Sequence, residues 1–293
     1  MKRTLVVLNP VAGRGRVRRE WPRMAARLRE AGVEFEMTET SAPGEAERIA
    51  AGADNYEVVV AAGGDGTVHE VANGLLRAGA GVALGVLPLG SGDDFAKMLP
   101  PGEAVARIAR GTARPMDAGR IRSESGERYF ANGMDIGFGA HAARNVRRVP
   151  RPFTGFGAYL GALAMTLVRY PKLDVSLQLD EGEAFAHTTT MTAVMNGRAF
   201  GGSFHVCPGA CADDGLLDLL IADGVGRLEI LGLVPKILRG AHAGHPRLQL
   251  RQAKRVLIES DAPLLVEADG EIAFEDAQRL EIEVLPGALR VLA

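Results

Sequence analysis

Short apolar runs alternate with amphipathic stretches over the first 117 residues of the chain. Residues 4–8, 58–62 and 85–88 are uncharged runs with the length and composition of buried parallel strands. Apolar side chains at helical spacing follow at residues 14–30, 68–76 and 102–111. This alternation predicts a three-layer α/β domain, with helices on both faces of a parallel sheet.

The hydrophobic pattern changes beyond Asp117. Short segments with a period of two and frequent turns follow, at residues 119–123, 128–132, 173–179, 188–196, 215–222, 255–259, 264–268 and 280–285. Such strands predict an antiparallel β-sandwich. Two apolar helical stretches, residues 160–168 and 230–243, interrupt the strands, and we expect both to pack on the sandwich. We therefore divide the chain into an α/β domain, residues 1–117, and a β-sandwich domain, residues 118–285.

Each predicted strand of the first domain runs into a glycine-rich turn. These turns are Asn9-Pro10-Val11-Ala12-Gly13, Gly63-Gly64-Asp65-Gly66-Thr67 and Leu89-Gly90-Ser91-Gly92-Asp93-Asp94. Glycines at a strand-to-helix turn let backbone N–H groups approach an anion where the helix dipole favours negative charge. Loops at the carboxyl ends of parallel strands open on one crevice. The three loops therefore predict a phosphate-binding site.

An acidic residue in such a loop repels phosphate unless a divalent cation or a ribose hydroxyl lies between them. Asp65 therefore indicates a nucleotide bound with magnesium, and Asp93 or Asp94 either shares the metal or caps the following helix. A second interpretation stays open: Thr67 and Glu70 have the spacing of a capping box, and the glycines then only form a tight turn.

Two acidic turns lie in the second domain. Asp269-Gly270-Glu271 follows an apolar strand, and its glycine permits a sharp turn that aims both carboxylates into one cleft. Spacing alone favours a β-turn with solvated acids. Asp213-Asp214-Gly215 suits a hard cation bound by carboxylate, carbonyl and water oxygens, or a plain hairpin turn.

Composition narrows the class of protein. The net charge of −2 and pI of about 6.3 give no reason to expect nucleic acid as a partner. Cys207 and Cys211 are too few for a disulfide framework and lack a second pair for zinc, so we expect them to pack in the core. The chain enters a strand directly and has no run of about 18 uncharged apolar residues, so we expect a cytoplasmic protein without a membrane span.

Basic and aromatic side chains gather near residues 144–156. Four arginines, at positions 144, 147, 148 and 151, precede Phe153 and Phe156. This combination suits an anionic membrane surface. A core helix with a cationic loop at its N-terminus is the alternative.

The motifs together resemble the lipid kinases of the diacylglycerol kinase catalytic superfamily, in their soluble bacterial branch that includes sphingosine kinase-like enzymes. The Gly63–Thr67 element is shared with NAD kinases and phosphofructokinases, and elements of the second half make the resemblance specific. The matching elements are Asn9-Pro10-x-Ala12-Gly13, Thr40-x-x-x-Gly44-x-Ala46, Gly63–Thr67 with Glu70, Leu89–Ala96, Gly201-Gly202, Pro208, Asp213–Asp218 and Asp269–Glu271.

The resemblance implies a fold of the NAD kinase and diacylglycerol kinase type, in which residues 286–293 return to the first domain. It implies ATP and Mg²⁺ as cofactors. It makes Glu271 the proton acceptor, supported by Asp269 or with Asp269 on the metal, and gives Asp65 a catalytic role. It also implies a structural magnesium held by Asp214 and the backbone carbonyls of Cys211 and Leu216. The nucleotide-binding residues are then Asn9, Pro10, Gly13, Thr40, Gly63, Gly64, Asp65, Gly66, Thr67, Glu70, Gly90, Ser91, Gly92 and Asp93.

Two departures from the family's usual sequence stand near the expected site. Asp93 replaces the usual asparagine and adds a negative charge near the triphosphate, and Gly139 stands where many members have aspartate. The expected reaction is phosphorylation of a lipid alcohol, by default diacylglycerol to phosphatidic acid. We expect transient contact with the inner face of the membrane and leave a homodimer open. The rival interpretations are an NAD kinase-like enzyme and a catalytically idle nucleotide- or lipid-binding regulator.

Overall fold

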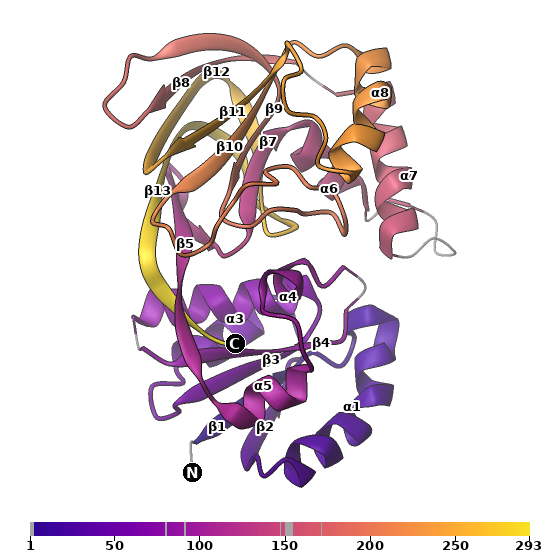
Figure 1. Cartoon of the computed structure of the whole chain (residues 1–293), viewed down its shortest axis with the longest axis vertical. Helices are drawn as coiled ribbons and strands as arrows, with labels where there is room; N and C mark the ends of the chain where they lie inside the picture. Colours follow the sequence, from indigo (N-terminus) through magenta and orange to yellow (C-terminus); the bar gives the residue numbers. More distant parts are fainter. Residues whose placement is uncertain (1–2, 80, 91, 147, 150–154, 171) are drawn as a thin grey trace. The chain divides into compact units, whose positions relative to one another are not determined.

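The structure is a computed structural model that describes residues 3–293 except 80, 91, 147, 150–154 and 171 (Figure 1). The chain divides into two compact units. Unit 1 comprises Met1–Asp117 together with Gly287–Ala293, and unit 2 comprises Ala118–Pro286. Each unit has a hydrophobic core of its own.

Unit 1 alternates strands and helices. In chain order these are β1 (Thr4–Leu8), α1 (Ala12–Glu30), β2 (Phe35–Glu39), α2 (Glu45–Ala51), β3 (Val58–Gly63), α3 (Asp65–Ala78), β4 (Ala83–Pro88), α4 (Asp94–Met98), α5 (Ala104–Arg110) and the start of β5 (Ala113–Ser123).

The sheet of unit 1 is parallel, in the order β2-β1-β3-β4, and every residue of β1 and β3 is buried. The end of β13 (Glu271–Leu292) extends it, because Arg290 and Val291 pair in parallel with Ala83 and Leu84. α1 packs with α5, and α2 packs with α3. The chain reverses its direction across the sheet between β1 and β3, which makes the carboxyl ends of these strands the place for a ligand.

Unit 2 is built mainly of antiparallel strands. Its elements are β6 (Gly126–Phe130), β7 (Gly133–Gly137), α6 (Phe138–Val146), α7 (Gly155–Val168), β8 (Leu173–Leu179), β9 (Phe185–Met195), β10 (Leu217–Asp223), α8 (Arg227–Leu238), β11 (Leu248–Ala253), β12 (Arg255–Ala268) and most of β13.

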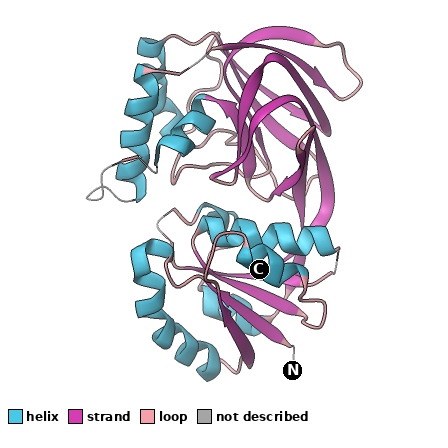
Figure 2. Cartoon of the chain, turned by 180° about the vertical axis from the view of Figure 1, so that it is seen from behind, coloured by secondary structure: helices cyan, strands magenta, loops and turns pink. Residues whose placement is uncertain are grey.

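Two long strands, β9 and β12, each pair with both β7 and β8. β9 pairs with β7 near its end and with β8 near its start, and β12 pairs with the same two strands at its own opposite ends. Their inward side chains, with those of β10 and β13, form the core of the unit. Helices α7 and α8 lie side by side on one flank of the strands (Figures 1 and 2).

Several predicted segments differ from the structure. Residues 255–259 and 264–268 belong to one strand, β12, whose register against β13 shifts between Glu259 and Leu264. Residues 280–285 are part of the 22-residue β13. β7 was not predicted, because its residues are buried throughout and show no alternation. α8 begins earlier than residues 230–243 suggest, directly after Gly226, whose N–H donates to Glu229.

Gly74 lets α3 approach α2 closely. A Cβ atom at this position would lie 2.8 Å from the Ala50 Cβ and 2.9 Å from the Ala51 nitrogen. Alanine normally stabilises a helix interior relative to glycine. We expect Gly74→Ala to lower the free energy of unfolding by about 1–3 kcal/mol, because the packed backbone must shift. Chemical denaturation measures this.

Gly232, in the interior of α8, provides the matched control because a Cβ there meets nothing within 4 Å. We expect Gly232→Ala to raise the free energy of unfolding by about 0.5–1 kcal/mol. Equal stabilisation by both substitutions would contradict the close packing of α2 on α3.

Candidate active site

The three glycine-rich loops of unit 1 meet at the carboxyl edge of its sheet. The Leu89 N–H donates to the Gly63 carbonyl over 2.9 Å, which ties the loop after β4 to the loop after β3. The Asn9 N–H donates to the Ala62 carbonyl over 3.0 Å. A Cβ at Gly90 would lie 2.5 Å from the Gly64 Cα, so the two backbones touch. The three loops therefore lie together in the structure, as the prediction of a single crevice requires.

The first loop keeps a left-handed backbone before α1 becomes regular. Gly13, Arg14 and Gly15 have φ values of 57°, 57° and 80°. A Cβ at Gly13 would lie 3.1 Å from the Leu89 carbonyl oxygen.

Asn9 connects this first loop to the start of α3. Its side chain donates to the Thr67 hydroxyl over 3.1 Å and accepts from the Val11 N–H over 3.3 Å. The next residue, Pro10, is buried. The loop is therefore held from both sides, by its own backbone and by the helix that follows β3.

The capping-box interpretation of Thr67 and Glu70 is wrong. α3 begins at Asp65, its N-cap is Gly64, and no side chain caps it. The Glu70 carboxylate instead accepts from the N–H groups of Gly44 and Ala46, over 2.9 and 3.1 Å.

Glu70 therefore holds the segment from Thr40 to Ala46 against α3. Thr40 is buried, and its N–H donates to the Leu8 carbonyl over 2.8 Å. In the first turn of α3 the Thr67 and Val68 N–H groups donate to the Gly64 carbonyl. The earlier N–H groups, those of Asp65 and Gly66, lie at the helix N-terminus, which favours an anion.

Three carboxylates crowd this helix terminus. Asp65 is half-buried and its Oδ1 accepts from the Phe95 N–H over 3.2 Å. Burial, and then the Asp94 carboxylate, raise the pKa of Asp65 to about 6. Burial also raises the pKa of Asp93, whose Oδ1 accepts from the Gly90 N–H over 3.0 Å at a left-handed φ of 52°. The Asp93 side chain thus points back into the loop and does not cap α4.

The glycines of these loops leave room for the carboxylates because they have no side chain. A Cβ at Gly92 would lie 2.7 Å from the Asp65 Oδ2. Gly66 is half-buried in the first turn of α3. Ser91 lies outside the described residues, as do Arg147 and the segment 150–154 of the arginine-rich loop. The structure brings the other predicted residues of the three loops together at one place.

In unit 2, the Asp269-Gly270-Glu271 turn joins β12 to β13. Asp269 has a left-handed φ of 50°, and its carboxylate accepts from three backbone N–H groups, those of Ala131, Asn132 and Gly133, over 2.9–3.0 Å. The interpretation as a turn with solvated acids is therefore wrong for Asp269. Asp269 fixes the turn that presents the half-buried Glu271.

A pair of buried carboxyl groups lies next to this turn. Glu267 on β12 stands directly opposite Asp135 on β7, and both side chains are inaccessible to solvent or nearly so. Burial raises the pKa of Asp135 to about 7. Burial, and then the Asp135 carboxylate, raise the pKa of Glu267 well above its ordinary range. The Gly270 N–H donates to Glu267, so this side chain also supports the turn.

Gly139 makes room for the Asp135 carboxylate. The Ala140 N–H donates to Asp135 Oδ1 over 2.5 Å, and a Cβ at Gly139 would lie 2.7 Å from the Asp135 Cγ. Among the described residues Asp135 Oδ2 has no hydrogen-bond partner. A side chain at position 139 would therefore displace the Asp135 carboxylate.

The second acidic turn is on the surface. Asp214 Oδ1 accepts from the Leu216 N–H over 3.0 Å, and the Cys211 thiol donates to Asp213 Oδ1 over 2.9 Å. Cys207 is buried as expected, whereas Cys211 is exposed, which corrects the prediction that both cysteines pack in the core. Within the described part of the chain no group of three or more His, Cys, Asp or Glu residues has the arrangement of a metal site. The magnesium held by Asp214 and the backbone carbonyls of Cys211 and Leu216 stays a prediction.

An apolar pocket opens in unit 2, with a cavity volume of about 70 Å³. Its walls come from α6, α7, α8, strands β9 and β10, the start of β11, Val225 and the segment 200–206. Thr190 and Tyr159 are the lining residues with a polar side-chain atom, and all others are apolar or glycine. The lining has the apolar character that a hydrocarbon group requires, although the cavity itself is smaller than an acyl chain.

Comparisons with known proteins match this chain over nearly its whole length. The diacylglycerol kinase catalytic domain matches residues 3–121, and the YegS C-terminal NAD kinase beta sandwich-like domain matches residues 132–293. A Mycobacterium tuberculosis (strain CDC 1551 / Oshkosh) protein named diacylglycerol kinase is 32% identical, covering 97% of this chain and 93% of that protein. The chain belongs to the diacylglycerol kinase family. It is a lipid kinase with the predicted α/β and β-sandwich-like domains.

A second relative has a similar name, and a solved structure shares the fold. A Xanthomonas euvesicatoria pv. vesicatoria (strain 85-10) protein named probable lipid kinase YegS-like is 33% identical over 90% of this chain and 88% of that protein. A crystal structure titled as a diacylglycerol kinase from Bacillus anthracis str. Sterne matches the fold with a TM-score of 0.73 and 20% identity, covering 99% of this chain and 96% of that chain. In the described part of the lipid kinase, no helix has the length and apolar character to cross a membrane.

Sequence reasoning missed the Asp135–Glu267 pair of this lipid kinase. The available signal was weak: Glu267 interrupts an apolar strand, and Asp135 lies in a glycine-flanked segment. Their partnership depends on residues more than a hundred positions apart, which a local pattern does not reveal.

The buried pair makes stability depend on pH. The folded-state pKa of Asp135, about 7, lies above its ordinary value of 3.8, so the contribution to stability is complete below pH 3.8 and lost as pH rises through 7. An asparagine side chain at this position keeps an acceptor for the Ala140 N–H but carries no charge. We expect Asp135→Asn to be the more stable protein at pH 8, by on the order of 2–4 kcal/mol, with little advantage at pH 4.

Urea denaturation of wild type and Asp135→Asn across this pH range measures the effect. Asp276→Asn, at an exposed aspartate on β13, is the matched control and should show no such pH dependence. An advantage of Asp135→Asn that is equal at pH 4 and pH 8 would show that charge burial at this position carries no penalty.

Proposed function

We propose that this lipid kinase transfers the γ-phosphoryl group of ATP, with Mg²⁺, to the hydroxyl of diacylglycerol. The observation that carries the lipid acceptor is the apolar pocket of unit 2, whose walls offer a hydrocarbon chain no charged group. A soluble dinucleotide acceptor has no use for such a pocket. The Mycobacterium tuberculosis relative named diacylglycerol kinase supports diacylglycerol as the acceptor.

The nucleotide phosphates bind, in this proposal, where the three loops of unit 1 meet. The N–H groups of Gly64, Asp65 and Gly66 at the start of α3 offer donors, and the glycines there carry no side chain. Thr67 contributes its hydroxyl, held by Asn9. Glu70 fixes the neighbouring Thr40–Ala46 segment, which then borders the nucleotide.

No three carboxylates of the described part of unit 1 have the arrangement of a metal site, so in this proposal one or two of them hold a divalent cation together with the nucleotide phosphates. Burial, and then repulsion by Asp94, raise the pKa of Asp65, and a bound cation would relieve the repulsion among Asp65, Asp93 and Asp94. Carboxylate oxygens are the ligands that Mg²⁺ prefers. When bound, Mg²⁺ would neutralise charge on the transferred phosphate. The additional negative charge of Asp93, in place of the family's asparagine, strengthens the demand for the cation.

Glu271 accepts the proton of the lipid hydroxyl in this proposal. Phosphoryl transfer needs the hydroxyl in line with the γ-phosphate and a base for its proton. The Asp269 carboxylate accepts hydrogen bonds from three backbone N–H groups, so we propose that Asp269 positions Glu271. Glu267 supports the same turn through Gly270.

A radiolabelled ATP transfer assay tests the proposal, with Mg²⁺, a panel of lipid alcohols in mixed micelles, and NAD as a soluble acceptor. Label on diacylglycerol supports the proposal. Label on another lipid alcohol would replace the acceptor and keep the lipid kinase. Label on NAD alone, or ATP binding without transfer to any acceptor, would overturn the proposed reaction.

Glu271→Gln should lower kcat on the order of 10²–10⁴-fold and leave the affinity for ATP nearly unchanged, because a general base acts only in the chemical step. Steady-state kinetics and calorimetry measure the two quantities. Glu275→Gln, at an exposed glutamate on the same strand, is the control and should behave as wild type. An undiminished kcat in Glu271→Gln removes this residue from the mechanism.

Asp65→Asn should abolish most of the gain in ATP affinity that Mg²⁺ provides, because the cation loses a carboxylate ligand. Without Mg²⁺ the variant should bind ATP at least as well as wild type, since one repulsive charge is gone. Calorimetry with Mg²⁺ and with EDTA separates the two effects, and Asp54→Asn, at an exposed aspartate, is the control. The same Mg²⁺ dependence in variant and wild type would place the cation elsewhere.

A further inference from the structure

Helices α7 and α8 of unit 2 expose large apolar side chains on their outer faces. Leu228 and Leu231 of α8 are 84% and 54% exposed, and Val168 of α7 is 73% exposed. Met165 and Leu160 of α7 are exposed to about 40%. These five are more than half of the nine most exposed large hydrophobic residues in the described chain. Scattered exposure is ordinary, but a concentration on two neighbouring helices marks an interaction surface.

The inner faces of the same helices line the apolar pocket. Leu163 of α7 and Ile230, Leu233 and Val234 of α8 are lining residues. Along α8 the two sets separate cleanly: Leu228 and Leu231 lie on a different side from the buried Ile230 and Leu233, as the 100° step of a helix allows. A thin helical layer therefore separates the pocket from the exposed apolar face.

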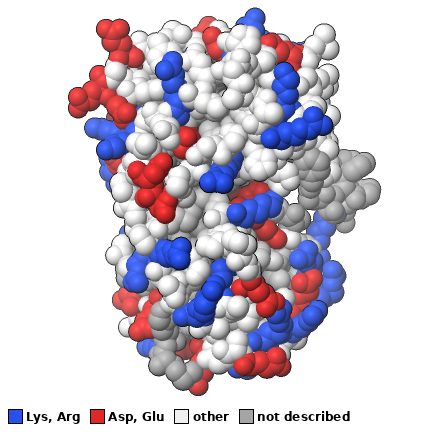
Figure 3. All heavy atoms as spheres, in the orientation of Figure 1, with Lys and Arg blue, Asp and Glu red and all other residues white. Residues whose placement is uncertain are grey.

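Basic side chains surround this face. Arg227 and Lys236 of α8 and Arg239 directly after it are exposed, and none of them pairs with a carboxylate among the residues that the structure describes. Arg169 at the end of α7 is exposed as well. Figure 3 shows Lys and Arg side chains over the part of unit 2 that carries α8. α7 itself has no charged residue.

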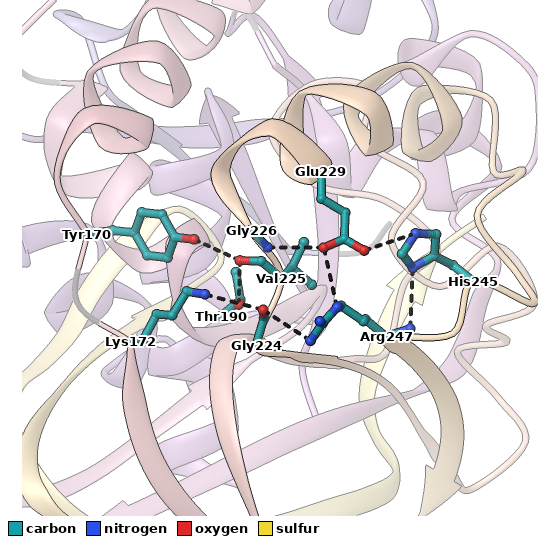
Figure 4. A network of polar contacts seen from close by, with 9 residues as sticks. All are labelled: Tyr170, Lys172, Thr190, Gly224, Val225, Gly226, Glu229, His245 and Arg247. Atoms are coloured by element: carbon teal, nitrogen blue, oxygen red, sulfur yellow. Dashed lines mark hydrogen bonds and ion pairs between the residues drawn. The ribbon is translucent and has the colours of Figure 1, made fainter.

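The single acidic side chain of α8 is turned away from the face (Figure 4). The Glu229 carboxylate accepts from the Gly226 N–H over 3.1 Å. Its Oε2 lies 3.4 Å from Arg247 Nε, and its Oε1 lies 3.5 Å from His245 Nε2. The only carboxylate of α8 is therefore engaged with these partners, and the charged side chains on the outer side of the helix are all positive.

Further hydrogen bonds fix the segment that leads into α8. Lys172 and Arg247 donate to the Gly224 carbonyl, and Tyr170 donates to the Val225 carbonyl. This network, drawn in Figure 4, holds the start of α8 to the body of unit 2. The exposed leucines of the first helical turns are therefore presented on a fixed support.

We propose that the outer face of α7 and α8 docks on an anionic lipid bilayer, from which the lipid acceptor enters the pocket. We call this surface, with Leu160, Met165, Val168, Leu228 and Leu231 and the cations Arg227, Lys236 and Arg239, the α7–α8 face. The proposal rests on the proposed function for the identity of the lipid, because the acceptor is a membrane component.

The chemistry of the α7–α8 face matches a bilayer interface in two respects. Its apolar side chains insert at the boundary of the acyl chains, and its unpaired cations meet anionic headgroups. An acidic partner protein would meet the cations but would leave the pocket behind the helices without a role.

Vesicle sedimentation of the full chain tests the proposal. The probes are phosphatidylcholine vesicles with about 30 mol% phosphatidylglycerol, and pure phosphatidylcholine vesicles. We expect wild type to bind the anionic vesicles, and Leu228→Ser/Leu231→Ser to bind them at least about tenfold more weakly, because Leu228 is the most exposed apolar side chain of the face and Leu231 is exposed beside it. Arg227→Gln/Lys236→Gln/Arg239→Gln should lose the preference for phosphatidylglycerol.

Phe185→Ser is the matched control, because this half-exposed hydrophobic residue begins β9, where it pairs with Leu177 of β8 rather than lying on a helix. It should bind vesicles as wild type does, and thermal melts confirm that the variants are folded. Unchanged vesicle binding of Leu228→Ser/Leu231→Ser would overturn the proposal. So would a wild-type dimer that this variant converts to a monomer in sedimentation velocity, because the face would then be covered by a second copy.

A kinetic comparison separates this proposal from the proposed function. With a short-chain diacylglycerol below its aggregation concentration, Leu228→Ser/Leu231→Ser should keep wild-type kcat/KM, and with vesicle-embedded diacylglycerol it should lose at least about tenfold. Equal losses on both substrates would place the leucines in substrate binding and overturn the docking role. If wild type phosphorylates neither substrate, the proposed function fails, and vesicle sedimentation still decides the docking surface.

Discussion

The contact between the Gly64 and Gly90 backbones is the constraint on which the site of unit 1 depends. Because neither residue has a Cβ, the loop after β4 closes onto the start of α3, and Leu89 reaches the Gly63 carbonyl. This closure buries Asp65 and brings Asp93 and Asp94 beside it, and burial, followed by repulsion from Asp94, raises the pKa of Asp65. A side chain at either glycine would separate the loops and relieve the repulsion. The crowding that destabilises the free protein is thus the feature that attracts a cation.

In unit 2 the Asp269–Glu271 turn is likewise fixed by acidic side chains in a close-packed setting. Asp269 adopts a left-handed backbone and gives its carboxylate to the backbone of Ala131–Gly133, while Glu267 holds Gly270 from the strand before it. Glu267 does so from a buried position opposite Asp135, where two ionised carboxylates would be costly. A fold selected only for stability would place an amide at one of these positions. The cost of burying Asp135 opposite Glu267 indicates that the geometry which these residues give to the turn at Glu271 has a role other than stability.

Local sequence patterns predicted the features that depend on near neighbours. The apolar runs gave the strands β1, β3 and β4, and the glycine turns after them gave the loops that the structure brings together. Patterns failed where partners are distant: β7 has no alternation because both of its faces are buried, and Glu70 binds the start of α2 rather than its own helix. The exposed Cys211 and the buried Asp135 depend on the surface that the finished fold leaves or covers. The family resemblance located the Asp269–Glu271 turn, but only the structure shows that Asp269 is committed to backbone N–H groups.

Helix α7 shows why amphipathicity alone cannot assign a helix to its surroundings. Its sequence is apolar on every side and carries no charge, a pattern that is typical of a helix buried all round. One side of the helix packs on α6 and the rest of unit 2, where Ala162 and Thr166 are inaccessible, while Met165 and Val168 on the other side face outward. Exposed to water, that side costs free energy in proportion to its apolar area. An apolar pocket behind the helix and a bilayer in front of it would give both sides apolar surroundings, and so account for a sequence that neither the pocket nor the bilayer explains alone.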